Sequence, residues 1–226
     1  AWWGEPCLVV LGLGTFIMYT TWAALQGAHY EYKNYLSPFY SPLFKPSWWP
    51  FSPAILILWA PAGFRLTCYY YRKAYYRSFW WSPPACAVRD ARADYTGETG
   101  FPLILQNLHR YFFYAATLLL VFLWYDAVHS FIFDGRFGVG LGSLVLVANV
   151  AFLTLYSVSC HSCRHLCGGS LDRFSRDPVR YSVWKVVSTL NESHMLFAWI
   201  SLVLVALADL YIRLLSMGVV RDWRLF

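Results

Sequence analysis

Five long apolar stretches are the feature that most limits how this chain can fold. They cover residues 8–28, 53–71, 105–132, 139–159 and 195–216, and a helix needs roughly 20 apolar residues to cross the core of a bilayer. Only 13% of the 226 residues are charged, whereas a soluble domain carries about 25%, so little polar surface is left to face water. The sequence therefore predicts an all-α fold, an integral membrane bundle of five transmembrane helices.

The second stretch is the least regular of the five because it contains Pro61 and Arg65. We expect a spanning helix that is bent at the proline. No internal repeat is apparent, and the helices cannot bury their polar faces separately, so residues 1–226 are expected to form a single membrane-anchor domain. The beginning of the sequence lacks the pattern of a cleaved signal peptide.

Lysine and arginine are distributed unevenly among the loops. The loops at 72–104 and 160–194 hold five each, whereas the loops after the first and third stretches hold two and one. Positive loops stay on the cytoplasmic side, which predicts that 72–104 and 160–194 are cytoplasmic, with the N-terminus inside and the C-terminus outside. The net charge of +6 largely reflects this bias, so no nucleic-acid partner is expected.

A group of cysteines and histidines follows the fourth stretch. Residues 160–167 read Cys-His-Ser-Cys-Arg-His-Leu-Cys, and the predicted orientation places Cys68, Cys86, His109 and His194 on the same side. Any one of them could be a packing or interfacial residue, and a disulfide is disfavoured in the cytoplasm. The co-location of so many soft ligands nevertheless indicates a metal centre.

Several centres fit this set of ligands. Two cysteines and two histidines suit zinc or a Rieske-type 2Fe-2S cluster, and two facing histidines suit haem b. Cys163 and His165 have the C-x-H spacing of a Rieske box, but no C-x-x-H box follows, so a cluster would be assembled from separate helices. Helical spacing puts Tyr156, Cys160 and Cys163 on one inward face, whereas His161 points away and is the least suitable ligand.

Polar residues also occur within and at the outer ends of the apolar stretches. Arg65, one turn deeper than Cys68, could stabilise a reduced cluster or a quinone anion. Asp126, His129 and Asp209 could bind a quinone head group and exchange protons with the outside. The alternative for Asp209 is a structural ion pair with Arg213, four residues further along the helix.

Three segments then indicate a family. His-Arg-Tyr-Phe-Phe-Tyr at 109–114, Ser-Cys-His-Ser-Cys-Arg-His at 159–165 and Asn-Glu-Ser-His-Met-Leu-Phe-Ala-Trp at 191–199 resemble the membrane-anchor subunit of actinobacterial succinate dehydrogenases, of the mycobacterial type with a single five-helix anchor. The resemblance implies a multi-pass protein of the inner (plasma) membrane. It also implies an iron–sulfur subunit and a flavoprotein subunit as partners, docked on the basic loops at 72–105 and 160–190, with succinate oxidation on those partners and a possible higher oligomer.

Anchors of this family pass electrons to quinone, and the actinobacterial resemblance implies menaquinone. Many hold haem b, and one branch holds a Rieske-type 2Fe-2S cluster. The second stretch lacks a histidine where a haem ligand is expected, and the 160–167 segment is richer in cysteine than haem requires, so the resemblance favours the cluster. It implies that four of six residues are its ligands: Cys86, His109, Cys160, Cys163, His165 and His194. It implies a quinone site among Arg65, Tyr156, Asp126, His129 and Asp209.

Two functions of other classes compete with an electron-transfer anchor. A proton-coupled membrane transporter could use the histidines and aspartates as a relay, although such proteins often show inverted repeats and broken helices. A structural zinc site would hold the same ligands without redox activity.

Overall fold

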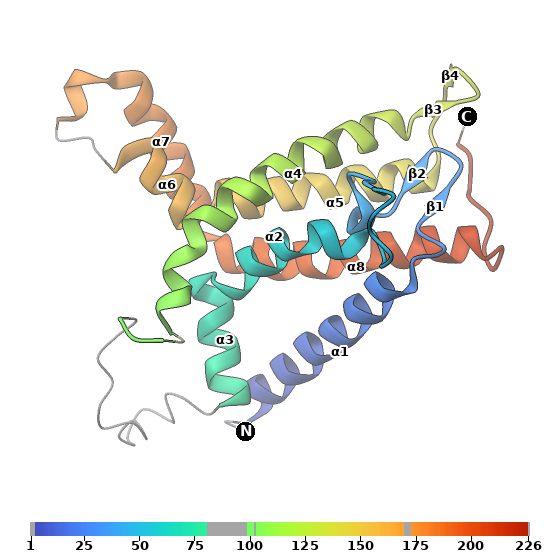
Figure 1. Cartoon of the computed structure of the whole chain (residues 1–226). Helices are drawn as coiled ribbons and strands as arrows, with labels where there is room; N and C mark the ends of the chain where they lie inside the picture. The colour runs from blue at the N-terminus through green and yellow to red at the C-terminus, as the bar shows by residue number, and fades with distance from the viewer. Residues whose placement is uncertain (1–2, 81–98, 102, 170–172, 226) are drawn as a thin grey trace.

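The computed structural model describes residues 3–80, 99–101, 103–169 and 173–225. These residues form eight α-helices and two short β-hairpins (Figure 1), so the predicted all-α class is confirmed. The helices are α1 (Gly4–Gln26), α2 (Ala54–Leu66), α3 (Tyr69–Phe79), α4 (His109–His129), α5 (Leu141–Val158), α6 (His161–Gly168), α7 (Pro178–Glu192) and α8 (His194–Ser216).

Among the described residues, four segments are long and apolar enough to cross a membrane. They are Gly4–Gln26, Ile104–His129, Leu141–Val158 and His194–Ser216, and they agree with four of the five predicted stretches within a few residues. The segment that contains α4 begins in a 3₁₀ helix, η2 (Leu103–Leu108). The chain is therefore a multi-pass membrane protein.

The second predicted stretch is shorter than expected, because the helix does not continue through 53–71. α2 has 13 residues, about 20 Å at 1.5 Å per residue, which is less than the roughly 30 Å of a bilayer core. Pro61 lies inside α2 without ending it. The chain instead turns at Cys68, whose backbone is extended (φ −67°, ψ 130°), and α3 leaves in a new direction (Figure 1). A fifth crossing thus remains a prediction.

The bundle is built around the pair formed by α5 and α8. The helix α8 packs most extensively on α5, while α4 packs on α5 and α2, and α1 packs on α3 and α8. Close approach of α2 and α4 requires Gly63, since a Cβ atom there would lie 2.3 Å from the ring of Phe112. Small residues at helix contacts are typical of membrane bundles, where van der Waals packing drives association.

The two β-hairpins and the C-terminal segment lie at one end of the bundle. β1 (Glu31–Tyr32) pairs with β2 (Tyr35–Leu36), and β3 (Ile132–Phe133) pairs with β4 (Arg136–Phe137). The turn between β3 and β4 is Asp134-Gly135 with φ of 50° and 78°, the positive angles that a tight hairpin requires. Asp222 caps α5 by accepting the backbone N–H of Gly142 at 3.1 Å.

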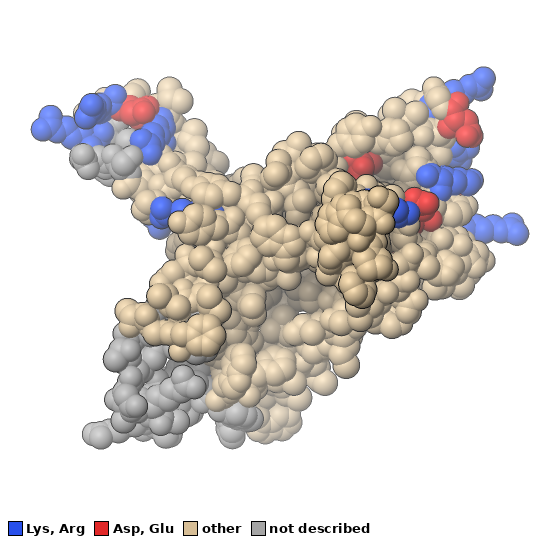
Figure 2. Space-filling view, in the orientation of Figure 1, with Lys and Arg blue, Asp and Glu red and all other residues tan. Residues whose placement is uncertain are grey.

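The opposite end carries α3, α6 and α7. On the face in Figure 2, charged side chains gather toward the two ends and leave a broad uncharged belt between them. Such a belt suits the lipid core, because buried charges are costly there. The loops predicted to be cytoplasmic contribute α3, α6 and α7, so they share one end. Which end faces the cytoplasm remains a prediction.

Candidate functional site

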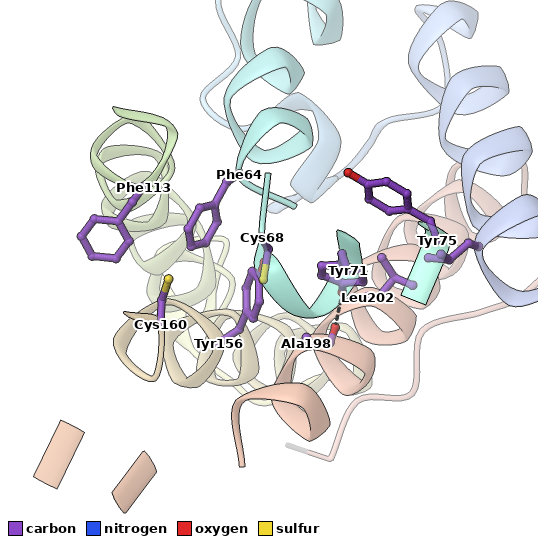
Figure 3. Close-up of a cluster of buried hydrophobic side chains, with 10 residues drawn as sticks. Phe64, Cys68, Tyr71, Tyr75, Phe113, Tyr156, Cys160, Ala198 and Leu202 are labelled. Atoms are coloured by element: carbon purple, nitrogen blue, oxygen red, sulfur yellow. Dashed lines mark hydrogen bonds between the residues drawn. The ribbon is translucent and has the colours of Figure 1, made fainter. Parts of the chain in front are cut away.

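A polar pocket opens at the end of the bundle where α2 and α5 finish and α4 and α8 begin. Its volume is about 590 Å³. Five cysteine and histidine side chains line it. His161 stacks on Tyr70, and the other four come from different parts of the chain: Cys68, His109, Cys160 and His194. Figure 3 draws both cysteines in one cluster of buried side chains. Sequence segments separated by up to 126 residues thus meet at this pocket.

The four side chains form two cysteine–histidine pairs. Nε2 of His109 lies 3.1 Å from Sγ of Cys160, and Nε2 of His194 lies 3.5 Å from Sγ of Cys68. Cys68, Cys160 and His194 are each at most 2% exposed. In the part of the chain that the structure describes, no three Cys, His, Asp or Glu side chains converge closely enough for one metal ion. The four ligands surround the pocket as two pairs.

The two cysteines are placed by helix breaks. Each one follows the C-cap residue of one helix, adopts an extended backbone and is the N-cap of the next helix. Each histidine is the first residue of its own helix, α4 or α8. Rigid helix termini therefore hold all four groups, which favours a precise site.

Burial controls the protonation of the free thiols of Cys160 and Cys163. Desolvation raises the pKa of Cys160 to about 12, against a smaller lowering by the backbone N–H of Ser162. Desolvation, followed by the neighbouring Cys167, raises the pKa of Cys163 to about 11. Both thiols are therefore protonated at neutral pH, and a metal that binds Cys160 must displace its proton.

Three of the six ligands implied by the resemblance meet in the pocket: His109, Cys160 and His194. Cys163 is half-buried on α6 and packs against the buried cluster that contains Cys68 and Cys160. His165 faces Arg110, with its Nδ1 3.3 Å from an Nη of the guanidinium at an exposed position. Cys86 lies outside the described residues. The ligand set of the sequence prediction remains untested.

Cys68 completes the group of four, although it was absent from the ligands expected from the sequence. Its place at the end of the second stretch that is predicted to face the cytoplasm was the signal that could have identified it. A regular helix through 71 would have kept its side chain on a helix face. The break after Thr67 instead turns it toward His194.

A second cavity of about 560 Å³ lies deeper in the bundle. Its walls are largely apolar and come from α1, α2, α4, α5 and α8, with Trp59 and Val205 among them. Arg65 and Tyr156 line it too. Arg65 donates hydrogen bonds to the hydroxyl of Tyr71, to the carbonyl of Ala198 at 3.2 Å and to the hydroxyl of Ser201 at 3.0 Å.

The Tyr156 hydroxyl is buried and has no hydrogen-bond partner among the described residues. The guanidinium carbon of Arg65 lies 4.8 Å from the centre of the same ring. An unpaired buried hydroxyl costs free energy, and Cys68 is among the groups that interact with this hydroxyl. Arg65 and Tyr156, predicted as quinone residues, are thus neighbours at one cavity.

Two aromatic rings separate the pocket from the cavity. Phe64 stacks on His109 with centroids 4.9 Å apart, and Tyr156 stacks on His194 with centroids 5.0 Å apart. Phe64 and Tyr156 also contact each other, at 5.1 Å. Both rings line the second cavity, so each histidine is one aromatic ring away from it.

The outer polar residues predicted for quinone are spread over separate contacts. Asp209 and Arg213 form the buried ion pair that the sequence left open as an alternative, at 2.8 Å, and Asp209 also accepts from Tyr19 at 2.6 Å and from Ser37. Asp126 accepts from the hydroxyl of Ser41, which lines the second cavity. His129 is exposed and stacks on Tyr125 at 5.9 Å.

Together the fold and the site define a multi-pass membrane protein with a buried cysteine–histidine centre at one end and an apolar cavity beside it. The family model described as actinobacterial succinate dehydrogenase subunit SdhC matches residues 4–218. The chain belongs to this family.

A solved structure agrees with this assignment. The chain is similar to a chain of the Mycobacterium smegmatis Sdh1 complex in the apo form, with 49% identity and a TM-score of 0.92 over 100% of this chain and 92% of that one. A search of curated protein sequences returned no match. The resemblance seen in the three sequence segments is therefore confirmed.

Proposed function

We propose that this chain anchors a succinate:quinone oxidoreductase and passes electrons through a redox centre held by Cys68, His109, Cys160 and His194 to a quinone in the second cavity. The observation that carries the proposal is the pairing of each histidine Nε2 with a cysteine sulfur around one pocket. The stacked rings beside the histidines supply a short path onward.

The donor set fits a Rieske-type 2Fe-2S cluster better than the two other candidates. Such clusters take two thiolates and two imidazoles, and the four side chains present this combination. Haem b needs only the two histidines as ligands, which would leave the two thiols beside them without a ligand role. A single zinc ion needs four converging ligands, and no three converge among the described residues.

The residues of the pocket would bind the cluster and exclude water from it. When bound, the cluster would supply one-electron transfer. The two thiols would lose their protons on binding, since thiolates are the ligands. The histidines would stay fixed by their helix termini, and Phe64 and Tyr156 would keep the space between the pocket and the cavity dry.

The second cavity suits a quinone with an apolar tail. Arg65 would stabilise negative charge on the quinone head group, because a cation in a water-poor site acts strongly on nearby charge. The unpaired hydroxyl of Tyr156 would donate a hydrogen bond to a quinone carbonyl. Menaquinone is the quinone that the family suggests. Asp126 and His129, toward the end of α4 that is predicted to face outward, would exchange protons with the outside. The role of Asp209 is better explained as structural, through its ion pair with Arg213.

The partners would be an iron–sulfur subunit and a flavoprotein subunit on the cytoplasmic side. Their docking surface would comprise the basic segments at 72–105 and 160–190, which include α3, α6 and α7. This arrangement places the mouth of the pocket beneath the partner, so electrons would enter there. Docking on the cytoplasmic side also requires that the chain cross the membrane five times, that α2 be the shortest of these crossings, and that the N-terminus lie in the cytoplasm.

Alanine variants of the complex test the ligand assignment. Cys68→Ala, Cys160→Ala, His109→Ala and His194→Ala should each remove two iron atoms per complex and a Rieske-type electron paramagnetic resonance (EPR) signal. Succinate oxidation with a soluble dye reports whether the partners remain assembled.

Cys163→Ala and His165→Ala are the matched controls and should keep the iron and the signal. The assignment fails if iron loss follows Cys163 or His165 instead of Cys68 or His109.

A further inference from the structure

Two short segments of the chain repeat the same local geometry around the pocket. Thr67 is the C-cap of α2 and Cys68 is the N-cap of α3. In the same way, Ser159 is the C-cap of α5 and Cys160 is the N-cap of α6. The φ, ψ angles are −89°, −4° for Thr67 and −79°, −4° for Ser159. They are −67°, 130° for Cys68 and −68°, 147° for Cys160.

The backbone hydrogen bonds repeat as well. Thr67 and Ser159 each donate to the carbonyl four residues earlier, at 3.0 Å in both cases, and each cysteine donates to the carbonyl three residues earlier, at 3.2 Å in both cases. The ring three residues before each hydroxyl residue, Phe64 or Tyr156, stacks on a histidine. A hydroxyl residue followed by a cysteine is therefore a repeated unit.

Each unit contacts both histidines. The Thr67 hydroxyl lies 2.9 Å from Nδ1 of His109, and the Ser159 hydroxyl lies 2.7 Å from Nδ1 of His194. The cysteine of each unit contacts the other histidine at Nε2. Thr67, His109, Cys160, Ser159, His194 and Cys68 consequently form a closed ring of contacts.

The hydroxyl protons fix the tautomers. The Thr67 hydroxyl donates to the carbonyl of Gly63 at 2.7 Å, and the Ser159 hydroxyl donates to the carbonyl of Tyr156 at 3.2 Å. A hydroxyl has one proton, and with that proton assigned to the carbonyl each oxygen accepts from the imidazole. In this assignment both histidines carry their proton on Nδ1 and direct the lone pair of Nε2 at the pocket.

We infer that Thr67 and Ser159 are a matched pair of positioning residues, each of which accepts the Nδ1–H of one histidine and holds its Nε2 toward the metal centre. The inference rests on the proposed function of the pocket. Partners of this kind orient a ligating histidine and raise its basicity. A more basic imidazole stabilises the oxidised centre, so Thr67 and Ser159 lower its reduction potential.

The test is an EPR-monitored redox titration of the purified complex, with iron and acid-labile sulfide measured in parallel. Thr67→Val and Ser159→Ala should each shift the potential of the membrane centre upward, and the double variant should shift it further because different histidines are affected. Thr67→Ser and Ser159→Thr keep a hydroxyl and should stay close to the wild-type potential.

The matched control is Thr117→Val. Thr117 also donates its hydroxyl to the carbonyl four residues earlier, at 2.8 Å, and it is not among the residues that line the pocket. Its substitution should leave the potential unchanged.

The outcomes separate this inference from the proposed function. A wild-type complex without the Rieske-type signal overturns the proposed function. A wild-type signal whose potential is unaltered, or lowered, in Thr67→Val and Ser159→Ala overturns the inference alone. Loss of iron in Thr67→Val supports the inference if Thr67→Ser restores the iron, and contradicts it if Thr67→Ser does not.

Discussion

At the scale of single residues, the site is defined by side chains that the membrane interior would otherwise exclude. His194 and Cys160 are each 1% exposed, and polar groups are buried in a bilayer only where they have partners or a ligand. His194 contacts Cys68 and the hydroxyl of Ser159, and Cys160 contacts His109. The preference for a metal centre follows from this mutual arrangement.

Substitution of Tyr156 by phenylalanine should have opposite effects on stability and on quinone binding. Without quinone, removal of a buried unpaired hydroxyl should stabilise the protein by about 1–3 kcal/mol. In turnover, loss of one hydrogen bond should raise the quinone KM about tenfold. Thermal unfolding and steady-state quinone reduction measure the two effects, and destabilisation with an unchanged KM would contradict the assigned role.

Substitution of Asp209 by asparagine should destabilise the fold with little effect on electron transfer. It leaves the buried Arg213 charge uncompensated, and breaking a buried pair costs about 3–5 kcal/mol. Thermal unfolding should detect the loss, with the exposed Asp134→Asn as control. If Asp209→Asn abolished quinone reduction at full stability, the quinone role predicted from the sequence would hold instead of the structural one.

At the scale of elements, helix ends decide where the chemistry lies. The apolar pattern predicted four of the long segments well, because spanning helices require sustained hydrophobicity. It could not predict the break at Thr67 and Cys68, since hydropathy continues across it while the backbone turns. Cys68 was left out of the expected ligands for this reason. His109 and His194 were identified because they open the helices α4 and α8.

The contact between α2 and α4 is a second feature that the pattern could not reveal. Gly63→Ala should destabilise the bundle by about 1–3 kcal/mol through overpacking, because the new Cβ would meet the ring of Phe112 at 2.3 Å. Gly14→Ala is the matched control, since no atom lies within 4 Å of its Cβ position. Equal unfolding temperatures for the two variants would show that α2 and α4 can move apart at no cost.

At the scale of the whole molecule, two units of similar local geometry meet at one pocket. No repeat was apparent in the sequence, because Phe64-Arg-Leu-Thr-Cys68 and Tyr156-Ser-Val-Ser-Cys160 share only the final cysteine and the types of their ring and hydroxyl residues. Similar backbone geometry can thus be specified by chemically similar side chains. Co-location of cysteine and histidine was predictable from the charge bias of the loops, whereas their pairing required the fold.

Cysteine labelling tests the orientation of the molecule. Arg77→Cys and Lys185→Cys place thiols at the end with α3 and α7, and Lys33→Cys and Asp134→Cys place them in the β-hairpins at the other end. In intact cells, a membrane-impermeant maleimide should label the hairpin positions, and it should reach residues 77 and 185 only after lysis. Labelling of the unsubstituted chain measures, as a control, the reaction of the maleimide with the exposed Cys7. The reverse pattern would place the basic loops outside.

The central claim is that this anchor holds an iron–sulfur centre between its partners and quinone. The most direct test is spectroscopy of the wild-type complex: a reduced-minus-oxidised visible spectrum and a low-temperature EPR spectrum of the same reduced sample. The account predicts a Rieske-type signal equivalent to about one cluster per anchor chain and no b-type haem band. A b-type haem band without that signal would contradict it, and would make His109 and His194 candidates for haem ligands.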